Sequence, residues 1–303
     1  MKNIWESYYK KRGWNNMEQK KERYIIAVDM DGTLLNSQGK ITKRTADVLQ
    51  RLLDEGHYVV PASGRSLGLL PLAVSALEGI SYAVLENGAV VWDWKNSCVL
   101  KRFPMPEGAA ERILASAETY VKAEEEEILY FVEFFAEGQV YADKADLERF
   151  SDVDILGNFA DYMLYGHTYL ENLMEQKDLL NQAEKLNLFF AVPKHGAAVR
   201  KIWDNDLEVS VTSSVPGNAE FNARGVDKGN GLLPVMEKLG IDKEHVIAIG
   251  DSDNDLEMLQ MAGISVAMGN AAAHIKETAV YVTGDNDHDG AAVFLEKFFC
   301  FDK

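Results

Sequence analysis

The sequence predicts an α/β fold in which helices cover a parallel sheet and a second, α+β domain is inserted into the chain. After residue 23, short runs rich in β-branched residues alternate with stretches of helical period, in the order βαβαβ. The same alternation returns near the C-terminus, while the middle of the chain follows a different pattern. These observations predict one sheet built from both ends of the chain.

The N-terminal part contains three expected strands and two expected helices. The strands are rich in Val, Ile and Tyr, whereas the helices repeat apolar residues every three or four positions. We expect strands at 24–30, 57–63 and 81–87, and helices at 42–56 and 67–79. This order is typical of a Rossmann-like parallel sheet.

The C-terminal part repeats this alternation. We expect strands at 245–250, 264–269 and 279–283, and helices at 253–263, 271–278 and 289–299. The middle differs, because two strands flank Glu137 and Gly138 and further strands are expected at 186–193 and 207–214, between helices. The middle should therefore form a separate α+β domain.

The spacing of polar strand ends sets the expected domain boundaries. The residues between Asp31 and Ser63 suffice for one helix and one strand, whereas those between Ser63 and Lys228 can form a domain. We expect a flexible N-terminal tail at 1–22, a core at 23–103 and 223–303, and an inserted domain at 104–222.

Composition excludes several classes of partner. The formal net charge is −17 and the pI is near 4.8, so neither nucleic acid nor an anionic membrane surface is an expected partner. No apolar stretch approaches the roughly 18 residues of a membrane span, and Cys98 and Cys300 fit neither a disulfide framework nor a zinc pattern. We expect a cytoplasmic protein; the pattern leaves its oligomeric state open.

Two carboxylates, Asp29 and Asp31, lie at the end of the first expected strand, just before Gly32. Residues two apart on a strand point the same way, so both side chains can enter one pocket if the extended geometry persists. Ligands of open α/β sheets bind beyond the carboxyl ends of the strands. Because two unpaired carboxylates repel, a cation is expected between them.

Further polar groups follow other strands. Asp251 and Asp255 come directly after the strand at 245–250, and hard oxygen ligands without Cys or His favour Mg²⁺. Ser63, the Gly64 amide and Lys228 would hold an anion. A divalent cation, an aspartate nucleophile, a lysine and a hydroxyl together predict a phosphoryl-transfer site.

Four motifs in this order, "DMDGTLL", "SGR", "GVDKG" and "GDSDND", resemble the haloacid dehalogenase-like superfamily, specifically its Cof-type phosphatases. The resemblance runs from residue 24 to the C-terminus and continues in "ENGA" and "VAMGNA". It implies that residues 104–222 form the larger, C2B-like α+β cap, which in this family covers small phosphorylated metabolites such as sugar phosphates or phosphorylated cofactors. It also implies an aspartyl-phosphate intermediate.

The resemblance assigns roles position by position. It implies Asp29 as nucleophile and Asp31 as general acid, later the base for water. It implies Mg²⁺ bound by Asp29, the Asp31 main-chain carbonyl and Asp251, with Asp255 supporting the metal or the lysine. The transferring phosphoryl group would be held by Ser63, Gly64, Lys228 and Asn254.

Two other functions stay open at this point. The ATPases of the superfamily resemble "DKTGT", with Thr where this chain has Asp31, so ion pumping is not expected. Phosphosugar mutases keep the second aspartate and remain an alternative. A metabolite-binding regulator without catalysis is the other alternative, although the intact nucleophile, acid and lysine argue against it.

Some charged segments have less specific patterns. Residues 285–296 match the spacing of a calcium-binding loop, but a strand is expected before them where an EF-hand needs a helix. We interpret the run 124–127 as a solvated helix end. Arg65 is expected at the sheet edge, and no substrate role is assigned to His167, Lys194, His195 and Arg200.

Overall fold

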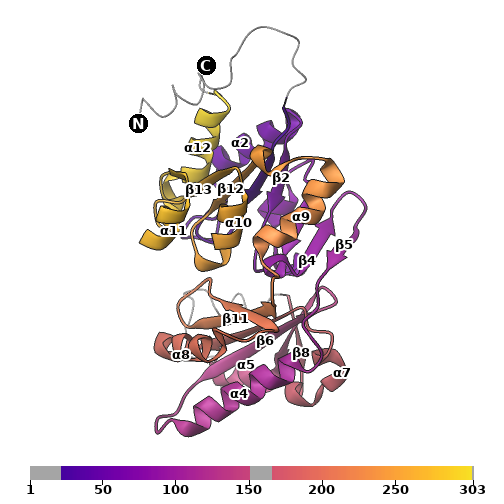
Figure 1. Cartoon of the computed structure of the whole chain (residues 1–303), viewed down its shortest axis with the longest axis vertical. Helices are drawn as coiled ribbons and strands as arrows, with labels where there is room; N and C mark the ends of the chain where they lie inside the picture. The colour runs from indigo at the N-terminus through magenta and orange to yellow at the C-terminus, as the bar shows by residue number, and fades with distance from the viewer. Residues whose placement is uncertain (1–21, 151–165, 302–303) are drawn as a thin grey trace.

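The computed structural model describes residues 22–150 and 166–301. Its core is a five-stranded parallel sheet in the order β14–β13–β12–β1–β2, so strands from both ends of the chain form one sheet, as predicted. The strands are β1 (Ile25–Val28), β2 (Tyr58–Pro61), β12 (Val246–Gly250), β13 (Ile264–Ala267) and β14 (Tyr281–Val282). The predicted α/β class is confirmed, and Figure 1 shows this core in the upper part of the molecule.

Helices cover both faces of the core sheet. Alternate residues of β1 point to opposite sides: Ile26 and Val28 face one apolar cluster, and Ile25 and Ala27 face another. The first cluster is closed by α2 (Lys43–Asp54) and α12 (Gly290–Phe298), and the second by α9 (Lys228–Leu239), α10 (Leu256–Met261) and α11 (Ala273–Thr278). Because both faces are buried, the core strands read as continuous apolar runs.

A small antiparallel sheet extends the core, and one sequence prediction fails beside it. The strands are β3 (Tyr82–Leu85), β4 (Val90–Asp93) and β5 (Cys98–Arg102), and a parallel bridge between Ala62 and Val84 joins them to β2. The expected helix 67–79 is wrong in extent: the chain forms a 3₁₀ turn at Leu67–Leu69 and one short helix, α3 (Leu72–Ser75). Pro71 separates them, because the residue before a proline is pushed into extended conformation.

The inserted region forms a mixed six-stranded sheet in the order β10–β11–β9–β6–β7–β8. Its strands are β6 (Tyr130–Ala136), β7 (Gln139–Asp143), β8 (His167–Leu170), β9 (Lys185–Phe190), β10 (Val209–Thr212) and β11 (Asn218–Ala223). Its helices are α4 (Ala109–Ala123), α5 (Lys144–Phe150), α7 (Lys177–Leu180) and α8 (Pro193–Trp203). The strands expected around Glu137 and Gly138 and at 186–193 and 207–214 are present, whereas β8 and β11 had no sequence prediction.

This inserted sheet has one apolar and one polar face. Leu186, Leu188 and Phe190 of β9 pack on the cap helices, which lie largely on the side away from the core in Figure 1. Lys185 and Asn187 point from the same strand to the other face, toward the core. The chain enters this region after β5 and leaves it with β11, which ends at Ala223. The expected limits of the inserted domain, 104 and 222, stay a prediction.

Candidate active site

The candidate site lies at the carboxyl ends of the core strands. Asp29 follows β1, is buried at 4% exposure, and its amide donates to Ile249 O of the neighbouring strand. Asp31 lies beyond a turn at Met30, so extended geometry does not persist between the two carboxylates. Both side chains nevertheless line one cavity, as the sequence predicted.

Lys228 links two of the predicted carboxylates. It begins α9, directly after Asp227, whose side chain caps the helix by accepting the Asn230 amide. Its fully buried Nζ lies 2.6 Å from Asp29 Oδ1 and 2.7 Å from Asp255 Oδ1. Burial lowers the pKa of Lys228, but the two carboxylates outweigh burial, so the pKa lies above its ordinary value and the side chain stays charged.

The same carboxylates fit a divalent cation. Asp29, Asp251 and Asp255 offer oxygens that all lie within 4.8 Å of one another, and Lys228 offsets just one of their three charges. Asp29 Oδ2 is buried and has no hydrogen-bond partner among the described residues. Burial, followed by the charge of Asp255, raises the pKa of Asp29 well above its usual range and that of Asp251 to about 6. A hard cation would relieve this excess of negative charge.

Asp255 also shapes the loop that carries Asp251. Its Oδ2 accepts the backbone amides of Asp251 and Ser252 at 2.9 and 3.1 Å, closing a capping box with Ser252. Thr33 Oγ1 donates to Asp251 Oδ1 at 2.7 Å. Asp255 therefore supports both the lysine and the Asp251 loop, which agrees with the supporting position expected for it.

Asp31 has an environment opposite to that of Asp29. Its side chain is 48% exposed and forms a two-pronged ion pair with Arg65, Nε to Oδ2 and Nη2 to Oδ1, each at 2.7 Å. This contact occupies both oxygens of Asp31 and fixes the position of its side chain. Arg65, which the sequence placed at the sheet edge, thus reaches the candidate acid directly.

The expected phosphate-binding groups are arranged around this pair. Gly64 and Asn254 line the cavity with Asp29 and Asp31, whereas Ser63 is buried beside it and its Oγ accepts the Arg65 amide at 3.1 Å. Two hydrogen bonds fix the side-chain amide of Asn254: its Oδ1 accepts from Ser252 Oγ at 2.9 Å, and its Nδ2 donates to Asn87 Oδ1 at 3.1 Å.

The polar face of the inserted sheet contributes groups that sequence reasoning missed. Lys185 Nζ lies 2.5 Å from Glu220 Oε2 and donates to Gly64 O at 2.9 Å, while Asn87 Nδ2 donates to the same Glu220 oxygen at 2.6 Å. Although burial raises the pKa of Glu220, Lys185 and the hydroxyl of Ser214 outweigh it and lower the pKa to about 2. The available signal was the alternation of polar and apolar residues in "KLNLFF" and "NAEFNA".

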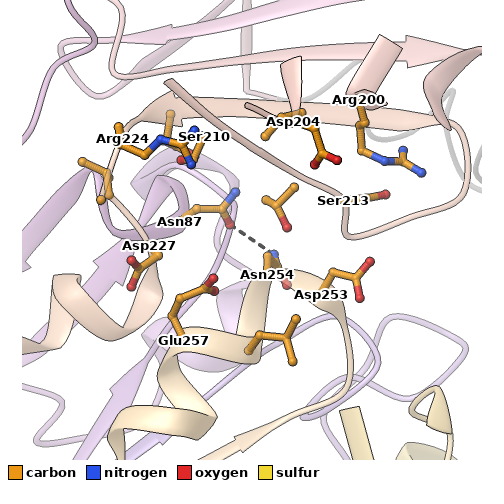
Figure 2. A pocket seen from close by; sticks show the side chains of 16 residues that line it. Asn87, Arg200, Asp204, Ser210, Ser213, Arg224, Asp227, Asp253, Asn254 and Glu257 are labelled. Carbon is orange, nitrogen blue, oxygen red and sulfur yellow. Dashed lines mark hydrogen bonds between the residues drawn. The ribbon is translucent and has the colours of Figure 1, made fainter. Parts of the chain in front are cut away.

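The cavity between these two faces has a volume of about 290 Å³. A larger cavity of about 490 Å³ lies beside it, with Asn254 lining both, and Figure 2 shows the Asn87–Asn254 hydrogen bond at its centre. Arg200 and Arg224 line this second cavity, but both donate to backbone carbonyl groups, and its acidic side chains outnumber them. The smaller cavity, which Asp29 and Asp31 line, is the candidate active site.

The remaining charged patterns are engaged elsewhere. The strand β14 precedes the segment with calcium-loop spacing, where an EF-hand would need a helix. The carboxylates of this segment contact separate partners instead of converging on one point: Asp285 contacts His288, Asp287 the Ser37 amide, Asp289 Thr42, and Glu296 Arg44. Glu126 pairs with Lys194. Neither His195 nor Arg200 lines the smaller cavity.

The sequence from residue 26 to 295 matches the profile of the family described as haloacid dehalogenase-like hydrolase. The chain belongs to this family. Two curated relatives of Bacillus subtilis (strain 168), the 5-amino-6-(5-phospho-D-ribitylamino)uracil phosphatases YcsE and YitU, are each 30% identical, covering 88% and 91% of this chain and 92% and 97% of theirs. The resemblance stated above is confirmed, and this hydrolase is a Cof-type phosphatase.

A solved structure supports the fold of this hydrolase. A sugar phosphatase of HAD subclass IIB superposes with a TM-score of 0.75 at 22% identity, over 91% of this chain and 99% of its own. The shared fold comprises the five-stranded core and the inserted mixed sheet, which we call the cap from here on. Within the described residues of the hydrolase, no helix combines the length and apolar character that crossing a membrane requires.

Proposed function

We propose that this protein is a Mg²⁺-dependent phosphatase that hydrolyses small phosphorylated metabolites through an aspartyl-phosphate on Asp29. The observation that carries the proposal is the cluster of Asp29, Lys228, Asp251 and Asp255, in which Asp29 lines a cavity between the core and the cap. Asp29 Oδ2 has no hydrogen-bond partner among the described residues, so it is available to attack phosphorus. The ammonium group of Lys228 beside it would reduce the repulsion between this carboxylate and an anionic phosphoryl group.

The two motif aspartates have different roles, Asp29 as the nucleophile and Asp31 as the acid and base. Asp29 Oδ2 attacks phosphorus, while Lys228 and the groups of Ser63, Gly64 and Asn254 stabilise charge on the phosphoryl oxygens. Asp31 gives a proton to the departing alkoxide and later takes one from the attacking water. Since Arg65 occupies both oxygens of Asp31, substrate binding must separate this ion pair before Asp31 can give a proton to the leaving group.

Asp29 and Asp251, with the main-chain carbonyl of Asp31, would hold the Mg²⁺ ion. When bound, the ion would neutralise the carboxylates and the phosphoryl oxygens. Lys228 favours the ionised form of Asp29 through its 2.6 Å contact and so opposes the effect of burial, and Asp255 keeps the Asp251 loop in place. The test is chelation: excess chelator should abolish turnover, added Mg²⁺ should restore it, and Ca²⁺ should restore it poorly because its shell is larger and less regular. Full activity in chelator contradicts the metal requirement.

The cavity and the relatives together indicate the substrate class. A volume of 290 Å³ lies at the small end of the range for ligand pockets, about 300–1,000 Å³, and suits a small ester. The curated relatives act on a phosphorylated ribityl group attached to a uracil, and the cap face that closes this cavity is polar. We therefore propose phosphate esters of polyols or sugars as the substrates.

The decisive experiment compares Asp29→Asn and Asp31→Asn with an aryl phosphate and a sugar phosphate. Asp29→Asn should be inactive on both. Nitrophenolate leaves without a proton, so Asp31→Asn should release about one equivalent of nitrophenol per site in a burst, followed by slow turnover because dephosphorylation lacks its base. Acid-quenched protein should then carry one phosphate on the Asp29 peptide.

The control is Asp47→Asn, which changes an exposed aspartate of α2 and should behave as wild type. If Asp31→Asn slows both esters equally, with no burst and no phosphorylated peptide, the division of labour between Asp29 and Asp31 is wrong.

A further inference from the structure

The cap face contains a buried acceptor that no described residue satisfies. Glu133, Asn187 and Glu220 lie side by side on β6, β9 and β11, forming one cross-strand row on the polar face. Asn187 is 3% exposed and lines the active-site cavity. Its Oδ1 has no hydrogen-bond donor among the described residues, and a buried carbonyl oxygen without a donor is costly.

The orientation of the Asn187 amide is fixed from behind. Asn187 Nδ2 donates to Glu133 Oε2 at 3.0 Å, and the other oxygen of Glu133 lies 2.6 Å from His167 Nε2. Both Glu133 and His167 side chains are fully buried. A carboxylate without a proton can only accept, so the amide nitrogen must face Glu133 and the carbonyl oxygen is left to face away from it.

The polar neighbours of Asn187 on the cap face hydrogen-bond to other groups, and none of those described donates to its Oδ1. Glu220 accepts from Lys185 and Asn87 on one oxygen, and from Ser214 and Asn218 on the other. Lys185 is divided between Glu220 and Gly64 O. Because Asn187 lines the active-site cavity, a molecule bound there is in a position to supply the donor that Oδ1 lacks.

We propose that Asn187 Oδ1 accepts a hydrogen bond from a hydroxyl or N–H group of the leaving group, and so selects esters of polyhydroxylated alcohols over plain alkyl esters. Asn187 is then a specificity-determining residue, and Glu133 with His167 positions it. This inference rests on the phosphatase function proposed above and adds the chemical feature of the substrate that the cap recognises.

The test compares D-ribitol 5-phosphate with n-pentyl phosphate, which share a five-carbon chain and an alkoxide leaving group but differ in hydroxyl donors. Wild type should prefer the ribitol ester by at least about tenfold in kcat/KM, since loss of a hydrogen bond at a buried polar group costs about that much or more. Asn187→Leu should lower kcat/KM for the ribitol ester by about 10- to 100-fold, mainly through KM. The pentyl ester should change less than about threefold, which also shows that the variant is folded.

Glu133→Gln provides the test of positioning. Its amide can donate or accept toward Asn187, so the Asn187 side chain can turn either end to the cavity. The preference for the ribitol ester should fall, but by less than in Asn187→Leu, and turnover of n-pentyl phosphate should stay near that of wild type. A merely structural role of Glu133 would lower both esters together.

A binding measurement tests the Asn187 inference independently of phosphate hydrolysis. In the Asp29→Asn background, titration calorimetry should show tighter binding of D-ribitol 5-phosphate than of n-pentyl phosphate, and Asn187→Leu should remove the difference. If no ester is hydrolysed but this difference holds, the phosphatase proposal fails and the Asn187 inference stands. Equal losses for both esters, no loss for either, or binding of neither overturns the inference.

Discussion

Asp29 and Asp31 are two positions apart in the chain, yet the structure gives them opposite surroundings. Asp29 is buried against Lys228, whereas Asp31 is half-exposed and held by Arg65. Burial keeps the Asp29 carboxylate free of water, which suits a nucleophile, and exposure lets Asp31 exchange a proton. The different roles of the two residues follow from their neighbours rather than from their identity.

Lys228→Ala should have two effects. It should lower kcat/KM by about 100- to 1,000-fold, because about 3 to 4 kcal/mol of transition-state stabilisation is lost in a water-poor site. It should also destabilise the fold by about 3 to 5 kcal/mol, since two buried carboxylates lose their partner. Turnover of p-nitrophenyl phosphate and urea unfolding measure these effects.

The matched control is Lys238→Ala, which removes an exposed lysine from the same helix and should change neither quantity. A folded Lys228→Ala protein that keeps more than a third of wild-type activity would mean that the lysine is misplaced in this mechanism.

The sequence predicted the residues of the core site better than their contacts. Asp29, Asp251 and Asp255 were identified because they follow apolar runs, and Lys228 because it is the cation of the motif "GVDKG"; the structure brings all four together. The Asp31–Arg65 pair was missed, because it depends on the turn at Met30 rather than on a strand. The contact between Lys185 and Glu220 was also not predictable from the sequence, because it depends on the register in which β9 and β11 pair.

At the scale of elements, the turn after β1 positions the carboxylates that we propose as metal ligands. Gly32 has φ of +85°, and a Cβ there would lie 2.4 Å from Asp251 Oδ2. Gly32 therefore meets two requirements at once, a left-handed backbone and close approach to the neighbouring loop. A side chain at this position would displace the carboxylate that we propose as a metal ligand.

Gly32→Ala should weaken Mg²⁺ activation by at least about tenfold, because the Asp251 carboxylate must move, and should cost about 1 to 2 kcal/mol of stability through backbone strain. The control is Gly56→Ala, where φ is +87° and nothing lies within 4 Å of the added Cβ, so strain occurs without the clash. Mg²⁺ titration of activity, calorimetric Mg²⁺ binding and thermal unfolding distinguish them. Equal Mg²⁺ affinity in both variants contradicts the assignment of Asp251.

Element predictions failed where local pattern and tertiary context disagreed. Residues 67–79 have helical period, but Pro71 divides them into a 3₁₀ turn and a single short helix. β11, "NAEFNA", has few residues typical of strands, and its position is set by pairing with β9 and β10. The central core strands were predictable because burial on both faces makes them apolar throughout.

At the scale of the whole molecule, the core and the cap each have an apolar cluster, and polar groups fill the junction between them. Asn222 of β11 donates to Glu86 O of the core at 3.0 Å and to Glu184 O of the cap at 3.1 Å. The Glu86 and Glu184 carboxyl groups adjoin each other at this junction, and their four oxygens are buried with no hydrogen-bond donor assigned to them among the described residues. Arg102 Nε lies 2.6 Å from Glu184 Oε1, but the pair lacks hydrogen-bonding geometry. Two buried carboxyl groups beside a single guanidinium repel each other when both are ionised, so burial at this junction favours a proton on one of them, and the raised pKa of Glu86 agrees with this.

This shared proton makes the stability of the protein depend on pH. Burial, followed by the charge of Glu184, raises the pKa of Glu86 well above its ordinary value of 4.5. A raised pKa means that the folded protein binds a proton that the unfolded chain releases, so the stabilisation is complete below pH 4.5. It is lost as pH rises through the raised pKa of Glu86, at a slope of about 1.4 kcal/mol per pH unit while one proton is released on unfolding.

Glu86→Gln should remove this dependence, because the amide needs no proton and can donate to Glu184 at every pH. The free energy of unfolding of the variant, relative to wild type, should therefore increase from pH 5 toward pH 9, as measured by urea unfolding at several pH values. Glu175→Gln, an exposed change in the cap, should follow wild type at each pH. Parallel stability profiles for wild type and Glu86→Gln would show that the junction holds no shared proton, and that an ion or water must satisfy the four buried oxygens instead.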